Sequence, residues 1–444
     1  MKLRIKLFAL MLCGTFCTAW AQETKQWTLQ ECIDYALENN IQLKKNSIKK
    51  RSSHEDVLQS QAELLPSLSA STSQSVTYSP WPETGRATVA NGYVQTSVDK
   101  VFYNGSYGVY ANWTVWNGGR NTNTIKLNEM NEQMAELDSA ITANNIQEQI
   151  VQLYVQIIYS NEAIGVNKEN LETCKKNEER GKTMVEVGKM SKADLAQLTA
   201  QRAQAEYNVV EAETNVKNYK RQLKQLLQLT DVSFDVAIPE ATDEMALQEI
   251  PALNTIYQQA LDNRPEIRNA MLGIESSDVS ISLAKAQRMP TVGLNASAVT
   301  NTTSMSDNAW GTQLKTNFNL GAGVSVSVPL FDNRQTKTAV NKAMLQKQSY
   351  QLDLENERTN LYSTIENYWL QAETNQSRFK AAKVSTESAQ ASFDLLQEQF
   401  RLGLKNIIEL MNGKDNLLTA KQNELQSKYL TILNIEMLKF YGKE

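Results

Sequence analysis

Residues 318–330 read Phe-Asn-Leu-Gly-Ala-Gly-Val-Ser-Val-Ser-Val-Pro-Leu, and no charged side chain interrupts them. Apolar residues alternate here with small or polar ones, which places the two kinds on opposite faces of a strand. A strand of about ten residues with one apolar and one small or polar face is typical of an outer-membrane β-barrel. A solvent-facing antiparallel sheet has the same alternation, so this stretch alone leaves both arrangements open.

Three other stretches carry the same alternation. Residues 67–79 are uncharged and rich in Ser and Thr, residues 106–115 alternate Ser, Gly, Asn and Thr with larger side chains, and residues 292–298 form a shorter copy. The sequence therefore predicts four strands in two pairs, each pair joined by a polar loop, at 80–104 and at 301–317. In a barrel protein such loops would face the cell exterior.

Long segments without helix breakers follow each strand pair. Residues 334–402 contain neither Pro nor Gly, and residues 121–179 contain one Gly and no Pro. At 1.5 Å per residue, the first segment predicts a helix of about 100 Å, too long to be buried in one globule. Residues 191–229 return with apolar positions three and four apart, which is typical of a coiled coil. Residues 27–64 also have helical periodicity and end before Pro66.

The chain repeats itself once. The matched pairs, in chain order, are Ala36 and Ala260, Pro66 and Pro290, Trp116 and Phe331, and Gly188 and Gly403. We therefore expect two structural repeats, 22–230 and 251–444, each with the order helix, strand, strand, long helix, helix, and an equatorial linker at 231–250 between them. A tandem duplication without functional meaning would leave the same pattern.

The beginning of the chain predicts export. Three basic residues within the first six precede an apolar run, and Ala19-Trp20-Ala21 resembles a cleavage site, which predicts a signal peptide at 1–21. A transmembrane anchor is the alternative, but the run is shorter than a hydrocarbon span requires. Neither Cys13 nor Cys17 follows the small residue of a lipoprotein signal, so no N-terminal lipid anchor is expected.

Composition argues against several classes of protein. With 45 basic and 49 acidic residues and a formal charge of −4, the chain has no basic footprint for nucleic acid. A single His argues against a His-based metal site and against His acid–base chemistry. No Ser-His-Asp triad, P-loop or CxxC motif is visible, so we expect neither an enzyme nor a cofactor. Cys32 and Cys174 lie far apart and are expected to be free.

Four strands are too few to close a membrane barrel, whose minimum is about eight. Beyond the signal peptide no stretch is apolar enough for a transmembrane helix, and lipid excludes open sheet edges. Three copies of the chain would supply twelve strands, although the arithmetic alone also permits dimers or tetramers.

With these elements, the sequence resembles the TolC family of outer membrane efflux proteins over essentially the whole mature chain. The motif Ala-Leu-Asp-Asn-Arg-Pro-Glu-Ile at 260–267 is similar to the family's A-L-x-x-R-P-E-L and has a weaker twin at 36–43. The other motifs that carry the resemblance are the strand openers 65–68 and 289–292, the strand-to-helix junctions 116–120 and 329–334, and the hairpin tips 187–190 and 401–404.

The resemblance implies a mainly α-helical chain whose four strands contribute to a trimeric 12-stranded outer-membrane β-barrel, continued by a long periplasmic α-helical barrel. It implies a passive exit duct of a tripartite efflux or type I secretion system. The implied partners are two further copies of the chain, a periplasmic adaptor protein, an inner-membrane pump and outer-membrane lipid. A structural coiled-coil or adhesin-like envelope protein would account for the helices, but not for four uncharged alternating segments.

The resemblance also points to the two hairpin tips. Gly188 and Gly403 are expected to end long helices, where a left-handed residue is common. The candidate residues for adaptor docking are Val187, Gly188, Arg401, Leu402, Gly403 and Leu404. Ordinary packing of the tip is the alternative interpretation.

Beyond the tips, the resemblance makes Asp194, Lys405 and Glu409 candidates for a periplasmic gate. Three copies of such acids would form a ring of like charge at the entrance. The family's second acid, three residues later, is replaced here by Gln197 and Asn412, so the gate would be less acidic. The alternative is that the acids stabilise the first turn of a helix through its dipole.

Overall fold

The computed structural model describes residues 26–81, 85–89, 92–96, 99–230, 234–239 and 242–442. The described residues in 26–43, 143–257 and 364–442 form one compact unit, called here the helical unit. Those in 44–142 and 258–363 form a second, the sheet unit. The predicted signal peptide at 1–21 lies outside the described residues.

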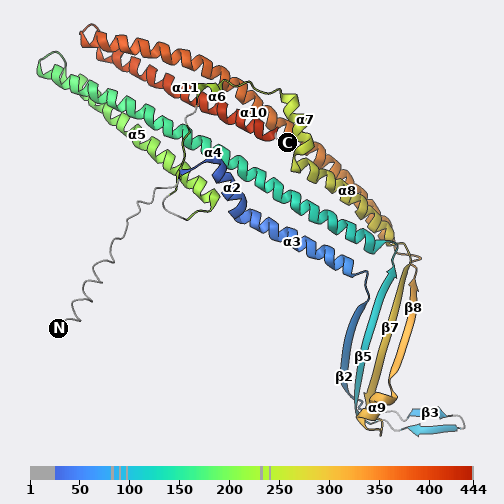
Figure 1. Cartoon of the computed structure of the whole chain (residues 1–444). Coiled ribbons are helices and arrows are strands. Elements are labelled where there is room, and N and C mark those ends of the chain that lie inside the picture. The colour runs from blue at the N-terminus through green and yellow to red at the C-terminus, as the bar shows by residue number, and fades with distance from the viewer. Residues whose placement is uncertain are drawn as a thin grey trace, which may run out of the picture. The chain divides into compact units, whose positions relative to one another are not determined.

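The four predicted strands are confirmed, and they form one antiparallel sheet in the sheet unit (Figure 1). In sheet order these are β2 (Ser67–Tyr78), β5 (Val101–Trp116), β7 (Thr291–Thr303) and β8 (Asn319–Ser327). The fourth strand was expected to reach residue 330 but ends at Ser327. Pro329, which has no N–H to donate to a ladder, accounts for the early end.

Both predicted loops contain regular structure. Within 80–104, β3 (Gly85–Val89) pairs with β4 (Gly92–Thr96) as an antiparallel hairpin. Within 301–317, α9 (Trp310–Thr316) forms a short helix beside the end of β7 (Figure 1). The sequence predicted polar loops in both places and did not indicate these short elements.

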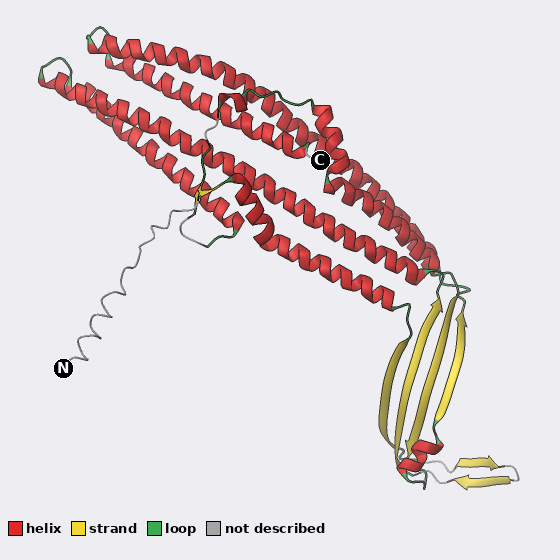
Figure 2. Ribbon diagram, in the orientation of Figure 1, coloured by secondary structure: helices red, strands yellow, loops and turns green. Residues whose placement is uncertain are grey.

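The long helices are confirmed (Figure 2). Two of them, α4 (Arg120–Glu186) and α10 (Gln335–Arg401), have 67 residues each, about 100 Å of helix. Each is followed by a return helix, α5 (Lys192–Leu227) or α11 (Ile407–Tyr441). None of the described helices is long and apolar enough to pass through a membrane.

The first helix is not continuous from 27 to 64, as its periodicity suggested. It consists of α2 (Leu29–Asn39) and α3 (Ile41–Ala62), with an extended residue, Asn40, between them. The Asn40 side chain accepts from the Gln42 N–H at 2.8 Å and donates to the Leu226 carbonyl at 3.3 Å, so it holds the break in place.

A corresponding break separates α7 (Leu253–Asn263) from α8 (Pro265–Ala286). Here Arg264 is extended because Pro265 disfavours the helical conformation in the residue before it.

Each of the two strand-to-helix junctions contains two consecutive left-handed residues, although the sequences differ. Gly118 and Gly119 have φ values of 69° and 78°, and Asn333 and Arg334 have 47° and 68°. The second junction lacks the paired glycines. Two left-handed residues nevertheless occur there without glycine, with Asn333 among the residue types that tolerate this region.

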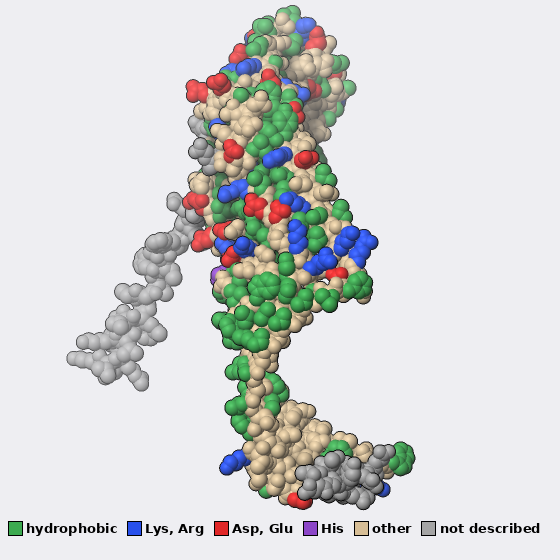
Figure 3. Space-filling view, turned by 90° about the vertical axis from the view of Figure 1, so that its right-hand side faces the viewer, with side chains coloured by type: hydrophobic (Ala, Val, Ile, Leu, Met, Phe, Trp, Pro, Cys, Tyr) green, Lys and Arg blue, Asp and Glu red, His purple; other side chains and the backbone are tan. Residues whose placement is uncertain are grey.

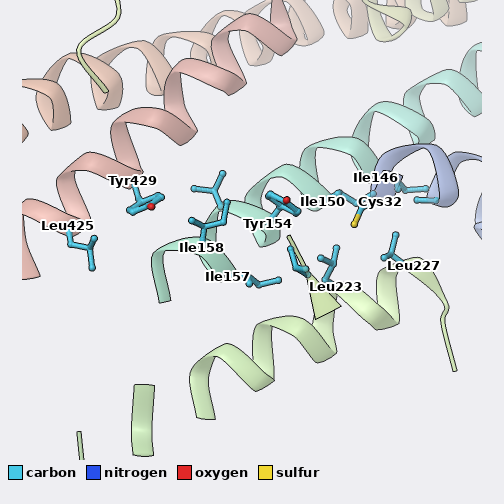
Figure 4. Packing of buried hydrophobic residues seen from close by; sticks show 13 residues of the cluster. Cys32, Ile146, Ile150, Tyr154, Ile157, Ile158, Leu223, Leu227, Leu425 and Tyr429 are labelled. Carbon is cyan, nitrogen blue, oxygen red and sulfur yellow. The ribbon is translucent and has the colours of Figure 1, made fainter. Parts of the chain in front are cut away.

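A hydrophobic core in the helical unit joins α2, α4, α5 and α11 (Figure 4). Its buried members include Cys32, Ile150, Tyr154, Leu223 and Leu227. Cys32 and Cys174 are both buried, and neither forms a disulfide, as predicted. The buried residues of α5 follow the predicted three–four spacing, and they are Leu198, Ala205, Val209, Ala212, Val216, Leu223 and Leu227.

The segment expected as a linker, 231–250, also carries structure. In its described part β6 (Asp235–Val236) pairs in parallel with β1 (Gln26–Trp27), and α6 (Asp243–Ala246) lies on α10 and α11. Asp243 bonds Lys383 Nζ at 2.6 Å and Lys428 Nζ at 3.1 Å. These contacts fix the linker on the helical unit.

Candidate functional site

The register of the sheet sorts its residues onto two faces. Residues directly opposite each other point to the same side of a sheet. Leu68 pairs with Ala111, Ala111 with Ala296, and Ala296 with Ala322, so these four share one face. The same parity gives this apolar face Leu68, Ala70, Val76, Val109, Ala111, Trp113, Leu294, Ala296, Ala298, Leu320, Ala322, Val324 and Val326.

The opposite face of the sheet is mostly small or polar. Its members include Ser67, Ser69, Ser71, Ser73, Ser75, Ser106, Asn112, Gly293, Asn295, Ser297, Gly321, Gly323 and Ser325. This polar face carries no Lys, Arg, Asp or Glu in any of the four strands. Such a surface suits contact with water.

Several large side chains of the apolar face are mostly exposed in the part of the chain that the structure describes. Leu68 is 76% exposed, Leu320 75% and Val324 68%. Figure 3 shows hydrophobic side chains along the sheet, whereas most of the visible charged side chains lie over the helices. An exposed apolar area of this extent marks a surface that meets a nonpolar partner or lipid.

Gly188 ends α4 as predicted. Its φ of 71° is left-handed, its N–H donates to the Val185 carbonyl at 3.0 Å, and the Lys189 N–H donates to the Met184 carbonyl at 2.8 Å. This pair of bonds is the Schellman pattern, which satisfies carbonyls at a helix end.

The second tip repeats the pattern at Gly403. Its φ is 76°, its N–H donates to the Phe400 carbonyl at 3.0 Å, and the Leu404 N–H donates to the Gln399 carbonyl at 2.9 Å. Arg401, the last residue of α10, bonds Glu398 within its own helix, with 2.9 Å from Nε to Oε2. The tip candidates thus lie at the two helix turns, which Figure 1 shows at one end of the helical unit.

The apolar side chains at these turns do not pack into the chain. Val187 is 61% exposed, Leu402 60% and Leu404 71%. Beneath the second turn lies a separate buried cluster, which consists of Leu198, Phe393, Phe400, Ile407, Leu410 and Leu417. The three exposed side chains are not members of this cluster.

Asp194 and Glu409 both occupy the third position of a helix. The Asp194 N–H donates to Ser191 Oγ at 3.1 Å, and the Ser191 hydroxyl donates to Asp194 Oδ2 at 2.8 Å. In α11 the Glu409 N–H donates to Asn406 Oδ1 at 2.9 Å and Glu409 Oε2 accepts from the Asn406 N–H at 3.2 Å. The two acids therefore stabilise helix starts, the alternative interpretation of these residues.

Among the three gate candidates, the structure brings Lys405 and Glu409 together. Lys405 Nζ lies 2.5 Å from Glu409 Oε1. The Lys405 hydrogen bond and the Asn406 N–H hold the pKa of Glu409 below its usual range. The acid is thus a paired carboxylate in the described chain, and Asp194 has its hydrogen bonds with Ser191 instead.

Sequence reasoning overlooked the cap residues Ser191 and Asn406. The spacing Ser191-x-x-Asp194 and Asn406-x-x-Glu409 before an apolar run is a capping signature and would have found them. It also overlooked α9, whose seven residues have no periodic pattern. No group of three or more His, Cys, Asp or Glu among the described residues is placed to hold a metal ion.

Comparison with known proteins gives the class. The model of the outer membrane efflux protein family matches residues 32–228 and 256–439, so the chain belongs to this family. It is 20% identical over 426 residues to the outer membrane efflux protein BepC of Brucella suis, covering 95% of this chain and 86% of BepC.

Two solved structures share the fold. CusC matches with a TM-score of 0.79 at 15% identity, covering 94% of this chain and 92% of CusC. The CmeC outer membrane channel of Campylobacter jejuni matches with 0.78 at 19% identity, covering 93% and 85%. Together with the family match, the two-faced sheet and the long helices identify an exit duct of the outer membrane with a periplasmic helical extension.

Proposed function

We propose that three copies of this chain form one duct, in which their sheets close a 12-stranded barrel and their helices form a periplasmic α-helical barrel. The duct passively conducts substrates that an inner-membrane pump and a periplasmic adaptor deliver, in an efflux or type I secretion system. It belongs to a family of efflux proteins, and its own role is conduction without catalysis. The exposed apolar face of the sheet is the observation that carries this proposal.

The edges of the sheet require partners. β2 and β8 are its outer strands, and each presents unpaired backbone groups on one side. In lipid, such groups cost several kcal/mol each when they have no partner. Pairing of β2 in one copy with β8 in the next satisfies both edges, and three copies supply the strand number expected from the family.

The two faces then have different surroundings. The apolar face meets lipid, and the Ser, Asn and Gly side chains of the polar face line a water-filled passage. Because that lining is uncharged within the strands, the passage itself selects weakly by charge. We assign the choice of substrate to the pump rather than to this barrel.

The repeated order of elements supports two structural repeats, 22–230 and 251–444, with 231–250 as the equatorial linker. The order helix, helix, strand, strand, long helix, helix occurs from α2 to α5 and again from α7 to α11, if the short elements β3, β4 and α9 are set aside. Two repeats per chain would give the trimer six similar wall segments.

Adaptor docking is assigned to the two hairpin tips. Val187, Leu402 and Leu404 expose apolar surface at turns that Gly188 and Gly403 hold in a fixed conformation. Arg401 adds a cation at the second turn. An adaptor with a complementary apolar tip would bury these side chains, which the duct leaves in water.

The gate proposal concerns Asp194, Lys405 and Glu409. In a trimer their three copies would surround the periplasmic entrance, and the pairing of Lys405 with Glu409 would partly neutralise the ring. Breaking this pair with Lys405→Ala should increase cation selectivity in planar-bilayer recordings. Unchanged selectivity would remove the residues from the gate and leave their helix-capping role.

The duct itself is tested by cell fractionation followed by sizing of the purified protein with multi-angle light scattering. We expect a homotrimer in the outer-membrane fraction and ion conductance in a planar bilayer. A soluble monomer would refute the duct and favour the structural coiled-coil alternative.

Docking is tested separately with Val187→Asp and Leu404→Asp. Both variants should reach the outer membrane as trimers but lose substrate export and crosslinking to the adaptor. The control is Lys189→Asp, which changes the charge beside Gly188 by −2, compared with −1 in each docking variant, and removes no apolar side chain. Equal loss in the control would point to charge at the tip, and no loss in either variant would exclude docking there.

A further inference from the structure

The short helix α9 lies on the apolar face of the sheet. Tyr107 pairs with Thr72 and with Thr300, so Tyr107 and Thr300 point to the same side as the apolar residues of β5 and β7. The indole ring of Trp310 meets the Tyr107 ring edge-on at 6.1 Å, and Trp310 Nε1 donates to the Tyr107 hydroxyl at 3.4 Å. The Thr300 hydroxyl donates to the Leu314 carbonyl at 2.8 Å.

Gln313 fastens α9 to the end of β7. It is buried, its Oε1 accepts from the Thr303 N–H at 2.7 Å, and its Nε2 donates to the Thr303 carbonyl at 3.1 Å and to the Asn308 carbonyl at 2.7 Å. The pairing of β7 with β8 stops at Val299, so Gln313 satisfies backbone groups that β8 does not reach. The position of α9 is therefore fixed by the sheet and not by a free loop.

The level of α9 along the strands follows from the length of the apolar face. A lipid-facing band about 25 Å tall, crossed by strands tilted by about 40°, takes up about ten residues of strand. We place the start of this band at Trp116, the residue of β5 nearest the helices, and ten residues counted from there reach Tyr107. Tyr107 and the helix packed on it thus mark the outer edge of the band.

Side chains at this level change in character. Toward the helices the apolar face carries Val109, Ala111 and Trp113. Directly beyond Tyr107 it carries Gln74, Tyr103 and Thr302 around Gly105, and the apolar Val76 and Val101 lie further out. The Tyr103 hydroxyl donates to Gln74 Oε1. Residues with an apolar ring and a polar tip are enriched where a membrane meets water.

We propose that α9 is a membrane-interface element on the outside of the barrel, seated among the lipid headgroups of the outer leaflet, and that it is not a lid over the mouth of the duct. The proposal rests on the barrel proposed above. Trp310 is 56% exposed on the surface of α9, and Lys315, also exposed, adds a cation suited to anionic headgroups. The neighbouring apolar face fixes lipid as the occupant, because that face is buried only in a bilayer.

Quenching of Trp310 fluorescence tests this placement in trimers reconstituted into phosphatidylcholine vesicles. The Trp310 signal is the difference between the unmodified protein and Trp310→Phe. We expect phosphatidylcholine brominated near the glycerol to quench this signal more strongly than lipid brominated near the terminal methyl or aqueous acrylamide. Quenching by acrylamide alone would overturn the proposal and place α9 at the aqueous mouth.

Two further variants keep the outcomes separable. The signal removed by Trp113→Phe comes from the half of the apolar face nearer the helices, and brominated lipid should quench it whatever α9 does. If it is not quenched, the orientation of the barrel is wrong and the proposed function fails with it. Gln313→Ala removes three hydrogen bonds of α9 and should shift the Trp310 signal from lipid quenching to acrylamide quenching. An unchanged Trp310 signal in this variant would contradict the anchoring by Gln313.

Discussion

The first strand-to-helix junction offers the sharpest test of the packing, because its two glycines share a left-handed conformation and differ in the space around them. Gly118 and Gly119 have similar left-handed φ values, 69° and 78°. A Cβ added at Gly118 would lie 2.3 Å from Met289 Cβ, whereas a Cβ added at Gly119 would meet nothing closer than 3.8 Å. Alanine at 119 therefore adds a backbone cost alone, and alanine at 118 adds the same cost and a clash.

The magnitudes follow from these two terms. A left-handed alanine costs about 1–2 kcal/mol, which is the expected loss in unfolding free energy for Gly119→Ala. Overpacking adds about 1–3 kcal/mol, so Gly118→Ala should lose about 2–5 kcal/mol per protomer. No rotamer of Met289 relieves this clash, because the atom that is struck is its Cβ. Relief requires movement of the backbone at the end of α8.

Guanidinium unfolding in detergent, followed by far-UV circular dichroism, measures both losses. Protein concentration must be equal in all samples, since assembly makes the midpoint depend on it. The midpoint should fall for both variants, and further for Gly118→Ala, with an unchanged denaturant dependence. Equal midpoints for the two variants would show that the predicted contact with Met289 is absent, and the reasoning would be refuted.

Three further predictions concern the helical unit. Tyr429→Phe removes a hydroxyl that donates to Glu162 Oε1 at 2.5 Å, and it should lower the unfolding free energy by about 1–3 kcal/mol in a denaturant titration. The control is Tyr207→Phe at an exposed position, which should change the unfolding free energy by less than about 0.5 kcal/mol. Lys405 lowers the pKa of Glu409, so the stability that Glu409 contributes is present above the usual carboxyl pKa and is lost as pH falls through the lowered pKa. Glu409→Gln should therefore weaken the fall of the melting temperature at acid pH. An unaltered fall would count against the pair of Lys405 and Glu409. Asp243→Asn removes the carboxylate that pairs with Lys428, whose side chain is only 15% exposed. The denaturant midpoint should fall further than it does for Asp307→Asn at an exposed position. Equal midpoints would mean that this ion pair does not hold α6.

The periodic parts of the fold could be predicted from sequence, because each depends on one repeating local rule. Alternation along 318–330 and the absence of breakers from 334 to 402 describe β8 and α10 to within a few residues. The break at Arg264 has a visible local cause in Pro265. The break at Asn40 does not, since it is held by a carbonyl of α5 that is remote in sequence.

Elements fixed by contacts remote in sequence were overlooked. The sequence of α9 has no periodicity, and Gln313 gains its role only because β8 stops short of Thr303. The left-handed Asn333 and Arg334 likewise lack the glycines that signal such a conformation. For Gln313 the decisive partner is the end of a neighbouring strand, which local sequence patterns do not contain.

The sequence predicted where the candidate site residues lie more reliably than it predicted what they do. Both tip glycines end their helices as expected, with the predicted left-handed conformation. Asp194 and Glu409 were expected either at a gate or in a first helical turn, and the described contacts are those of the first turn.

The two-faced sheet can be tested most directly on neighbouring residues of β8. Ser325 lies on the polar face and Val326 on the apolar face, one residue apart. Each is replaced by Cys, the protein is placed in a planar bilayer, and a charged, water-soluble thiol reagent is added while single-channel conductance is recorded. The buried Cys32 and Cys174 serve as the background in the unmodified protein. We predict a conductance change for Ser325→Cys and none for Val326→Cys. A change for Val326→Cys alone, or no channel from either protein, would contradict a duct lined by the polar face.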